Sequence, residues 1–564
     1  MQKSDYINYR AVVQYSELFG EKITEADFIS RLSGLNLRVA IAVISRLFSL
    51  QDAVMSDNET EERIQAKEVD SCLRFCHCYR SVISNGGNSA LYNSREFLYC
   101  PQTLLTLSKW LLAHCTNVGD MRTLNLDDFL EIMDLCLITN DLLPNDIHGH
   151  EIEYLFITLF YGTHRNLKSK IARAYHVFID LMDAIPTTRV FADDFNAKLG
   201  YSFEEYFAVL FYTLTLNFTS FDLPSFLGKT LSMSVNDFDA KKLAGKYPLV
   251  IKGLASDAQK LKKNAKNTRQ KEWDFEFFFL TPLIKTYDSI QSLSEMTLSY
   301  HFWEGLYWKV RYLYKEEDIG FLREFGRPFE KYVQWLTDEA VSSSNGLYTY
   351  CGEFYYKNGE IRSSDAYMKI GKTLIAIEAK AKSPHSKTLR GYAVEQITTE
   401  IEELLIYPVK QIDNRLCEIF QGNHYSNMEG FFSGIDSVIA LCVSMEKIQP
   451  VGKLLLYADD RLLYTRDEQA KISERIKAYH NINIEDYEVL CNLIEQRVDV
   501  SILLVDWFKA NRNDNYTAIP LSNYLSTKGY NYTCPKRVDE MFSSIMENLT
   551  TRIFGNGSNF PEEQ

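Results

Sequence analysis

Between Gly346 and Lys382 the chain reads GLYTYCGEFYYKNGEIRSSDAYMKIGKTLIAIEAKAK, and this segment is the most informative part of the 564 residues. Apolar and polar residues alternate along much of it, and aromatic and β-branched residues are frequent, which favours β-strands. Asn358-Gly359 suits a type I′ hairpin turn, and Gly371-Lys372 suits a type II′ turn with glycine first. We therefore predict a three-stranded antiparallel meander, with strands at 346–357, 361–370 and 373–381.

The geometry of the second hairpin determines which residues lie opposite each other. With a two-residue loop after Ile370, the register places Asp365 opposite Glu378. Opposite residues of a sheet have Cβ atoms about 4.5–5.5 Å apart. Lys380 is two residues beyond Glu378 and therefore lies on the same face. We predict that two carboxylates and one ammonium group converge on one side of the sheet.

The facing carboxylates of Asp365 and Glu378 would repel each other, and a divalent cation removes that repulsion. Mg²⁺ prefers oxygen ligands and is typically held by one or two carboxylates together with substrate phosphate, and Mn²⁺ suits the same ligands. A neighbouring lysine can orient or deprotonate a water molecule, or stabilise negative charge on a phosphoryl group. Asp365 and Glu378 are thus candidate metal ligands, and Lys380 is a candidate catalytic residue.

The same pattern also fits a solvent-exposed hairpin with alternating, salt-bridged charges. That alternative explains less well why Glu378 ends the most apolar strand of the region, which contains Leu374–Ile377. A third acid, Glu353, faces Ser364 if the first hairpin keeps the register of its turn. Glu353 would then point away from the carboxylate pair, and we leave it out of the predicted site.

Asp365, twelve intervening residues and Glu378-Ala379-Lys380 resemble the D-x(n)-E-x-K signature of the PD-(D/E)xK nuclease superfamily. Members of this family carry a helix before the meander, often with a glutamate, and the segment 326–333 with Glu330 is similar. Ser364 stands where the family name has proline.

The resemblance extends beyond the third strand. The family has a helix there, which 391–407 matches, and Gln396 lies where some members carry a polar residue. Four residues later this chain has Glu400, where one form of the family pattern has tyrosine. A further strand is expected next, and 436–445 fits it.

The resemblance implies a metal-dependent nuclease with a restriction-endonuclease-like α/β (α+β) core. Asp365 and Glu378 would hold Mg²⁺ or Mn²⁺, with the carbonyl of Ala379 as a further ligand. Lys380 would assist the attacking water, Glu330 would orient a second metal or a water, and Gln396 would complete the site. The family points to DNA as the substrate, and enzymes that cut both strands commonly present two sites, so we expect a homodimer or an assembly with partner proteins.

Residues 1–310 are predicted to be mainly helical and to sense a trigger, bind a partner or gate the site. Leu126, Phe129, Met133 and Leu137 recur at helical spacing, with Asn125 placed to cap the helix. Residues 311–564 are predicted to form the nuclease domain, with its core at about 320–445. By analogy with the family, an anti-phage defence or restriction-like role follows. A catalytically inactive nuclease fold that acts as a scaffold or binds nucleic acid through its helical half is the alternative.

The charge of the chain bears on its partners. There are 61 Lys+Arg and 75 Asp+Glu, a formal net charge of −14, which argues against coating nucleic acid by bulk charge. Residues 241–271 nevertheless carry ten basic residues and one acid, which suits either a solvated helix face or a phosphate-contacting patch. Without an apolar run of about 20 residues or a visible signal peptide, we expect a cytoplasmic protein that does not enter the membrane.

Overall fold

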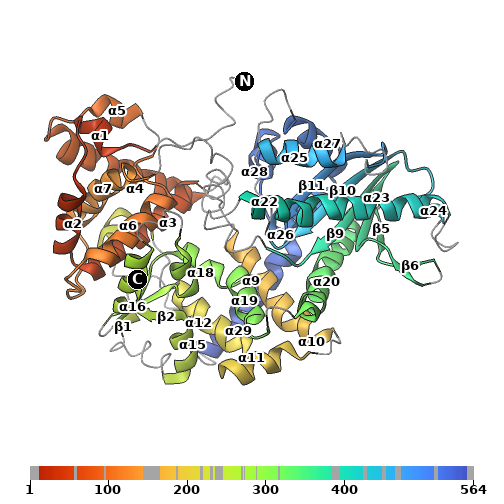
Figure 1. Cartoon of the computed structure of the whole chain (residues 1–564), viewed down its shortest axis with the longest axis horizontal. Coiled ribbons are helices and arrows are strands. Elements are labelled where there is room, and N and C mark those ends of the chain that lie inside the picture. Colours follow the sequence, from red (N-terminus) through yellow and green to blue (C-terminus); the bar gives the residue numbers. More distant parts are fainter. Residues whose placement is uncertain are drawn as a thin grey trace.

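The computed structural model of the chain describes most of its residues: 12–55, 60–94, 97–143, 166–185, 189–215, 220–228, 233–234, 245–268, 271, 274–286, 289–315, 318–357, 359–383, 394–422, 429–446, 452–463, 472–512 and 519–554. It is a mixed α+β structure in which helices predominate (Figure 1).

The N-terminal part is built from amphipathic helices. The expected stripe of 126–137 lies on one of them, and Asn125 caps it, because the Asn125 side chain accepts a hydrogen bond from the Asp128 amide. The elements are α1 Tyr15–Phe19, α2 Glu25–Gly34, α3 Leu37–Met55, α4 Glu61–His77, the π-helix η1 Cys78–Ile83, α5 Ser89–Ser94, α6 Pro101–His114 and α7 Leu126–Asn140.

The middle of the chain adds further helices and a small sheet that the sequence had not indicated. Its strand order is β1-β4-β3-β2. The elements are α9 Leu167–Tyr175, η2 His176–Leu181, α10 Met182–Ala184, α11 Phe191–Leu199, α12 Phe203–Thr215, α13 Leu223–Gly228, β1 Met233–Ser234, α15 Pro248–Leu254, β2 Ala255–Asp257, α16 Ala258–Asn267, α17 Glu276–Leu280, β3 Leu283–Lys285, β4 Ser289–Ser292, α18 Glu295–Tyr300 and α19 Glu304–Arg311.

The C-terminal part contains a five-stranded mixed sheet of order β11-β10-β9-β8-β5. Its elements are α20 Ile319–Ser343, β5 Thr349–Gly352, β6 Tyr355–Tyr356, β7 Ile361–Arg362, β8 Ala366–Ile370, β9 Thr373–Lys380, α22 Val394–Ile401, η3 Glu402–Ile406, α23 Tyr407–Phe420, α24 Glu429–Phe432, β10 Ser437–Ser444, α25 Gly452–Leu462, β11 Ile476–Asn483, α26 Ile484–Glu495, α27 Val500–Ala510, α28 Leu521–Thr527 and α29 Lys536–Phe554.

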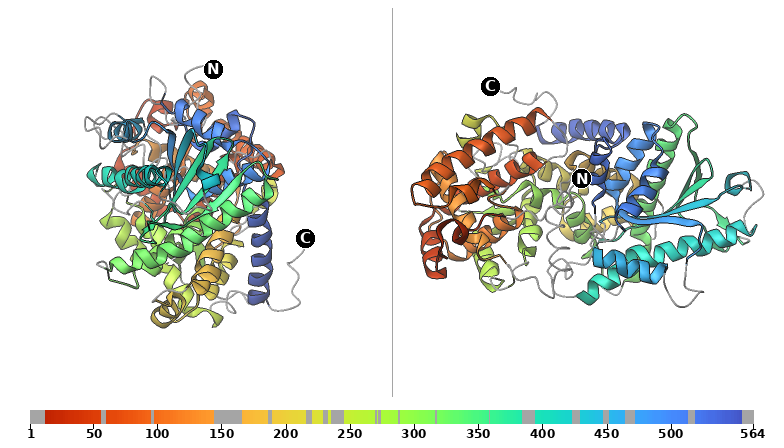
Figure 2. Two further views of the ribbon diagram at one scale, coloured as in Figure 1. Left: turned by 90° about the vertical axis from the view of Figure 1, so that its right-hand side faces the viewer. Right: turned by 90° about the horizontal axis from the view of Figure 1, so that it is seen from above.

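The central strand β9 is apolar because both of its faces are covered. It pairs antiparallel with β8 and parallel with β10, and Leu374–Ile377 are fully buried. Helices α20 and α26 pack on one face of the sheet, and η3 and α23 pack on the other (Figures 1 and 2). The helix α29 packs on α9 and α12 in the middle of the chain.

The second hairpin has the predicted register. Ile370 pairs with Thr373 and Ala366 with Ile377, and Gly371 has a φ of 55°, as a type II′ turn requires. Extending this register by one residue places Asp365 opposite Glu378, as predicted.

The first hairpin is less regular than predicted. The expected strand 346–357 is divided into β5 and β6, and 361–370 is divided into β7 and β8. Tyr355 pairs with Arg362, whereas Gly352 pairs with Ala366, so two residues on one side oppose three on the other. This irregularity, which we call the bulge, inserts one extra residue in the stretch 363–365, immediately beside the predicted site. Beyond it, β6 and β7 pair as a separate two-stranded ribbon.

Other predicted elements are extended or reassigned. The segment 326–333 lies within α20, and the strand predicted at 436–445 is β10. The helix predicted at 391–407 is described from Val394 and continues through η3 and α23 to Phe420. The parallel strand β11 was not predicted. Within the described residues, no helix is long and apolar enough to cross a bilayer.

Candidate active site

Asp365 lies where the bulge rejoins β8, and backbone contacts hold it on both sides. Its amide donates to the Ile377 carbonyl at 3.1 Å, and Gln334 Nε2 of α20 donates to its carbonyl at 3.0 Å. Its carboxylate Oδ2 accepts from the Ala379 amide at 2.7 Å. The residue is only 3% exposed, so its position is determined by the fold.

Glu378 is also 3% exposed and points toward α23. Lys380 Nζ donates to Glu378 Oε1 at 3.0 Å and to Gln411 Oε1 at 3.3 Å. Arg415 Nη1 donates to Glu378 Oε2 at 2.7 Å. Both carboxylates are buried, so the alternative of a solvent-exposed hairpin is wrong, but the charges are salt-bridged as that alternative expects.

A second arginine, Arg362, contacts the other acidic side chains of the site. Arg362 of β7 donates from Nη2 to Glu330 Oε2 at 2.6 Å, and the same atom is 3.7 Å from Asp365 Oδ1. Its Nε contacts Glu353. The prediction that Glu353 points away from the site is therefore wrong. The predicted register holds at Tyr355–Arg362 and shifts by one residue before Gly352–Ala366, and between these pairs Glu353 reaches the arginine that also contacts Asp365.

The charge environment of Asp365 is unusual. Burial, together with the negative charges of Glu378 and Glu330, raises the pKa of Asp365 to about 8. The hydrogen bond from the Ala379 amide and the charge of Lys380 act in the opposite direction. A divalent cation between the two carboxylates would relieve the cost of ionising both.

The donor set fits Mg²⁺ or Mn²⁺ bound together with a substrate. Among the described residues there is no group of three or more His, Cys, Asp and Glu side chains that could hold a metal unaided. Asp365 and Glu378 supply two carboxylates, however, which is the number that Mg²⁺ commonly takes from protein when phosphate completes its coordination. The Ala379 amide points toward Asp365, and its carbonyl lies on the same side of β9, because the amide and carbonyl of one strand residue share a side.

Some predicted residues cannot be placed. The backbone of Gln396 lies in α22, but its side chain is outside the described residues. Lys241, Lys242 and Arg269 of the basic segment 241–271 lie outside the described residues. Of those described, Lys260, Lys263 and Lys266 are exposed on α16 while Leu261 and Ala265 are buried, as on a solvated helix face.

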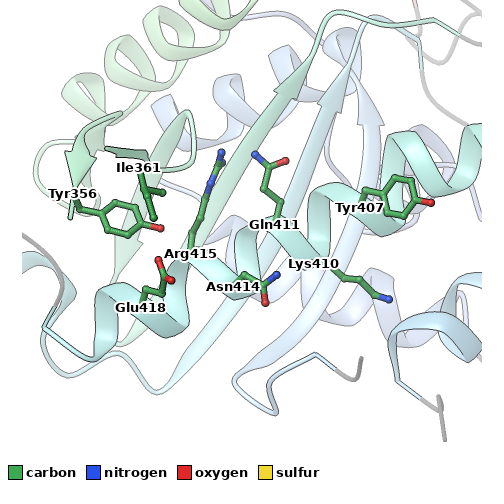
Figure 3. Close-up of a pocket in the computed structure, with 8 residues that line it drawn as sticks. All are labelled: Tyr356, Ile361, Tyr407, Lys410, Gln411, Asn414, Arg415 and Glu418. Carbon is green, nitrogen blue, oxygen red and sulfur yellow. The ribbon is translucent and has the colours of Figure 1, made fainter. Parts of the chain in front are cut away.

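A groove of about 460 Å³ lies beside the carboxylates, on the α23 side of the sheet. Figure 3 shows Gln411 and Arg415 rising from α23 toward the strands, with Tyr356 and Ile361 of the β6–β7 ribbon on one side and Tyr407 at the far end. Lys410, Asn414 and Glu418 complete the lining. Arg415 and Gln411 line the groove and also contact Glu378 and Lys380, so the groove adjoins the candidate site, although its carboxylates do not line the groove.

Sequence reasoning missed Arg362, Arg415, Gln411 and Glu353 as members of this site. Residues 362–390 contain seven basic residues, Arg362 among them, but this excess of positive charge does not show which acids Arg362 contacts. The spacing of Gln411 and Arg415, four residues apart on one helix, shows that they share a face but not which strand they reach.

Comparison of the chain with protein-family models, with curated proteins and with solved structures found no match.

Proposed function

We propose that the chain is a divalent-metal-dependent nuclease that hydrolyses phosphodiester bonds, with DNA as the preferred substrate. The observation that carries the proposal is the convergence of buried Asp365 and Glu378 with Lys380 at one end of β8 and β9, next to a groove that Gln411 and Arg415 line. The strand order, with α20 before and α22–α23 after the β8–β9 hairpin, supports a restriction-endonuclease-like core.

In this proposal each residue has a distinct task. Asp365, Glu378 and the Ala379 carbonyl would hold Mg²⁺ or Mn²⁺, which supplies Lewis-acid activation of water and neutralises phosphoryl charge. Lys380 Nζ, 3.0 Å from Glu378, orients the attacking water and stabilises the negative charge that develops on the phosphate. Glu330 is held by Arg362 near Asp365, where it can orient a second water or cation. Gln396 is proposed to assist from α22.

The substrate strand would enter along the groove. Lys410 and Arg415 offer positive charge for phosphates, and Gln411 and Asn414 offer amide groups for polar atoms of the nucleotide.

We further propose, by analogy with the nuclease family, an anti-phage defence or restriction-like role in which the helical half senses a trigger. In a homodimer, or in a complex with a partner protein, a second active site would cut the other DNA strand. Eleven free cysteines suit a reducing compartment such as the cytoplasm.

A plasmid-nicking assay with Mg²⁺ or Mn²⁺ tests the proposal. We expect nicking by the wild type and a loss of about 10²-fold or more in Glu378→Ala and in Lys380→Ala. Asp436→Asn is the matched control, because Asp436 forms an exposed ion pair with Lys372 at the other end of β9 and should cut at the wild-type rate.

Cleavage that survives both site substitutions would exclude this site. If no metal binds and no condition gives cleavage, the alternative of an inactive nuclease-fold scaffold is favoured, with the helical half as the binding region.

A further inference from the structure

The candidate ligands are occupied by cationic side chains of the protein itself. Glu378 is bound by Lys380 and Arg415, and Arg362 is shared among Glu330, Glu353 and Asp365. With all four ionised, four carboxylates face three cations and leave one formal negative charge, and with Asp365 protonated the cluster is formally neutral. In neither state does the arrangement attract a phosphodiester, which is itself negatively charged.

A divalent cation reverses that balance. With all four carboxylates ionised around it, the cluster has a formal charge of plus one, and one phosphodiester then brings it to zero. A metal ion that binds Asp365 and Glu378 must displace the guanidinium groups that now contact these carboxylates, because the metal ion and the guanidinium groups are both positive and repel each other. The arginines and the metal are therefore alternative partners of the same carboxylates.

The position of Arg415 gives its side chain a second place to go. It is 17% exposed and lines the groove while its Nη1 is 2.7 Å from Glu378. Its side chain already lines the groove, where the planar donor pair of a guanidinium suits phosphate oxygens.

Arg362 approaches the carboxylates from a different element than Arg415 does. It lies on β7, one strand of the short β6–β7 ribbon, and its side chain is 38% exposed. Arg362 and Arg415 therefore flank the carboxylates from two different elements, both within reach of solvent.

We propose that Arg362 and Arg415 are phosphate-binding residues that occupy the carboxylates when no divalent cation is bound and transfer to the substrate phosphate when one binds. Because this rests on the proposed function, metal binding and DNA binding are measured separately. The exchange makes tight DNA binding conditional on the cation.

The first measurement is calorimetric titration with Mn²⁺ alone. Arg415→Gln and Arg362→Gln each remove a competing cation, so we expect Mn²⁺ to bind about tenfold more tightly than to the wild type. Arg461→Gln is the matched control, because Arg461 pairs with Glu402 at the surface, away from the cluster, and its loss should leave Mn²⁺ affinity unchanged.

The second measurement is fluorescence anisotropy with a short labelled DNA duplex, with Ca²⁺ or with a chelator. In Ca²⁺ we expect each arginine variant to bind DNA about tenfold more weakly and to lose about 0.9 from the slope of log K against log salt, as expected for one lost phosphate contact. With the chelator, the variants and the wild type should bind DNA equally. Arg415→Lys should recover part of the affinity in Ca²⁺, because it restores the charge without the planar donor pair.

The outcomes separate the two proposals. If Mn²⁺ binding requires Glu378, as shown by its loss in Glu378→Gln, but is not tightened in either arginine variant, the exchange is wrong and the nuclease proposal stands. Equal loss of DNA affinity with and without Ca²⁺ would also overturn the exchange. If the wild type binds no Mn²⁺, both proposals fail. Arg362→Gln, at a half-exposed residue, carries the test if Arg415→Gln does not fold.

Discussion

The ionisation of Asp365 couples the site to the stability of the protein. The ordinary pKa of an aspartate is 3.8, and the fold raises the pKa of Asp365 to about 8. Between pH 3.8 and pH 8 the folded chain therefore holds a proton that the unfolded chain has lost. Folding therefore takes up a proton, and the free energy of unfolding falls as the pH rises through this window. The contribution of Asp365 to the free energy of unfolding is complete below pH 3.8 and is lost progressively as the pH rises to 8.

We expect Asp365→Asn to remove this pH dependence. The amide is uncharged and its oxygen can still accept from the Ala379 amide. Melting temperatures measured across the window should show the variant gaining stability over the wild type as the pH rises, with little difference at the acidic end. Asp436→Asn, at an exposed acid, should show no such trend. If Asp365→Asn were equally destabilised at every pH, the raised pKa of Asp365 in the fold would be contradicted.

At the scale of elements, the β8–β9 hairpin determines the geometry of the site. Its turn sets the register that places Asp365 opposite Glu378, and at the bulge on the other side of β8 Arg362 contacts Glu353 and lies 3.7 Å from Asp365. One hairpin thus presents Asp365, Glu378 and Lys380 on the α23 side of the sheet.

Gly371→Ala is expected to destabilise the protein by about 1–2 kcal/mol. Gly371 has a φ of 55°, and a residue with a Cβ is strained in that region. Gly34→Ala is the matched control: Gly34 ends α2 at a φ outside the left-handed region, with no atom within 4 Å of an added Cβ, so it should not destabilise. Urea unfolding of the two variants measures the difference. Equal midpoints would show that the turn is not strained by a side chain.

At the scale of the molecule, a buried ion pair connects the middle helices with the C-terminal sheet region. Arg173 of α9 donates to both oxygens of Glu488 of α26 at 2.7 Å, and Tyr332 of α20 donates to the same carboxylate at 2.7 Å. All three side chains are buried, and the hydrophobic cluster around them includes residues from both sides of position 310.

We expect Arg173→Met to lower the free energy of unfolding by about 3–5 kcal/mol, because it leaves the charge of Glu488 buried without its partner. The double variant Arg173→Met with Glu488→Leu should recover a large part of that loss. Urea unfolding provides the measurement. Lys372→Met, which breaks an exposed pair with Asp436, should change the stability by less than about 1 kcal/mol. Similar losses in the two single variants would contradict a special role for the buried pair.

Local chemistry made part of this structure predictable. The turn at Gly371-Lys372 and the alternation of strand faces are properties of neighbouring residues, so the register of Asp365 and Glu378 and the face of Lys380 followed from the sequence. The same is true of α7, whose apolar stripe and Asn125 cap are local signals.

Packing between distant segments decided the rest. The bulge that brings Glu353 to Arg362 depends on how β5 pairs with β8, and the contact of Arg415 and Gln411 with the site depends on α23 lying across β9. The parallel strand β11 and the Arg173–Glu488 pair join residues far apart in the chain. Turn and strand periodicity act over a few residues, and such contacts are fixed only when whole elements bury their apolar faces against each other. The sequence by itself therefore determined the carboxylates and lysine of the candidate site, and the tertiary structure determined the arginines that neutralise them.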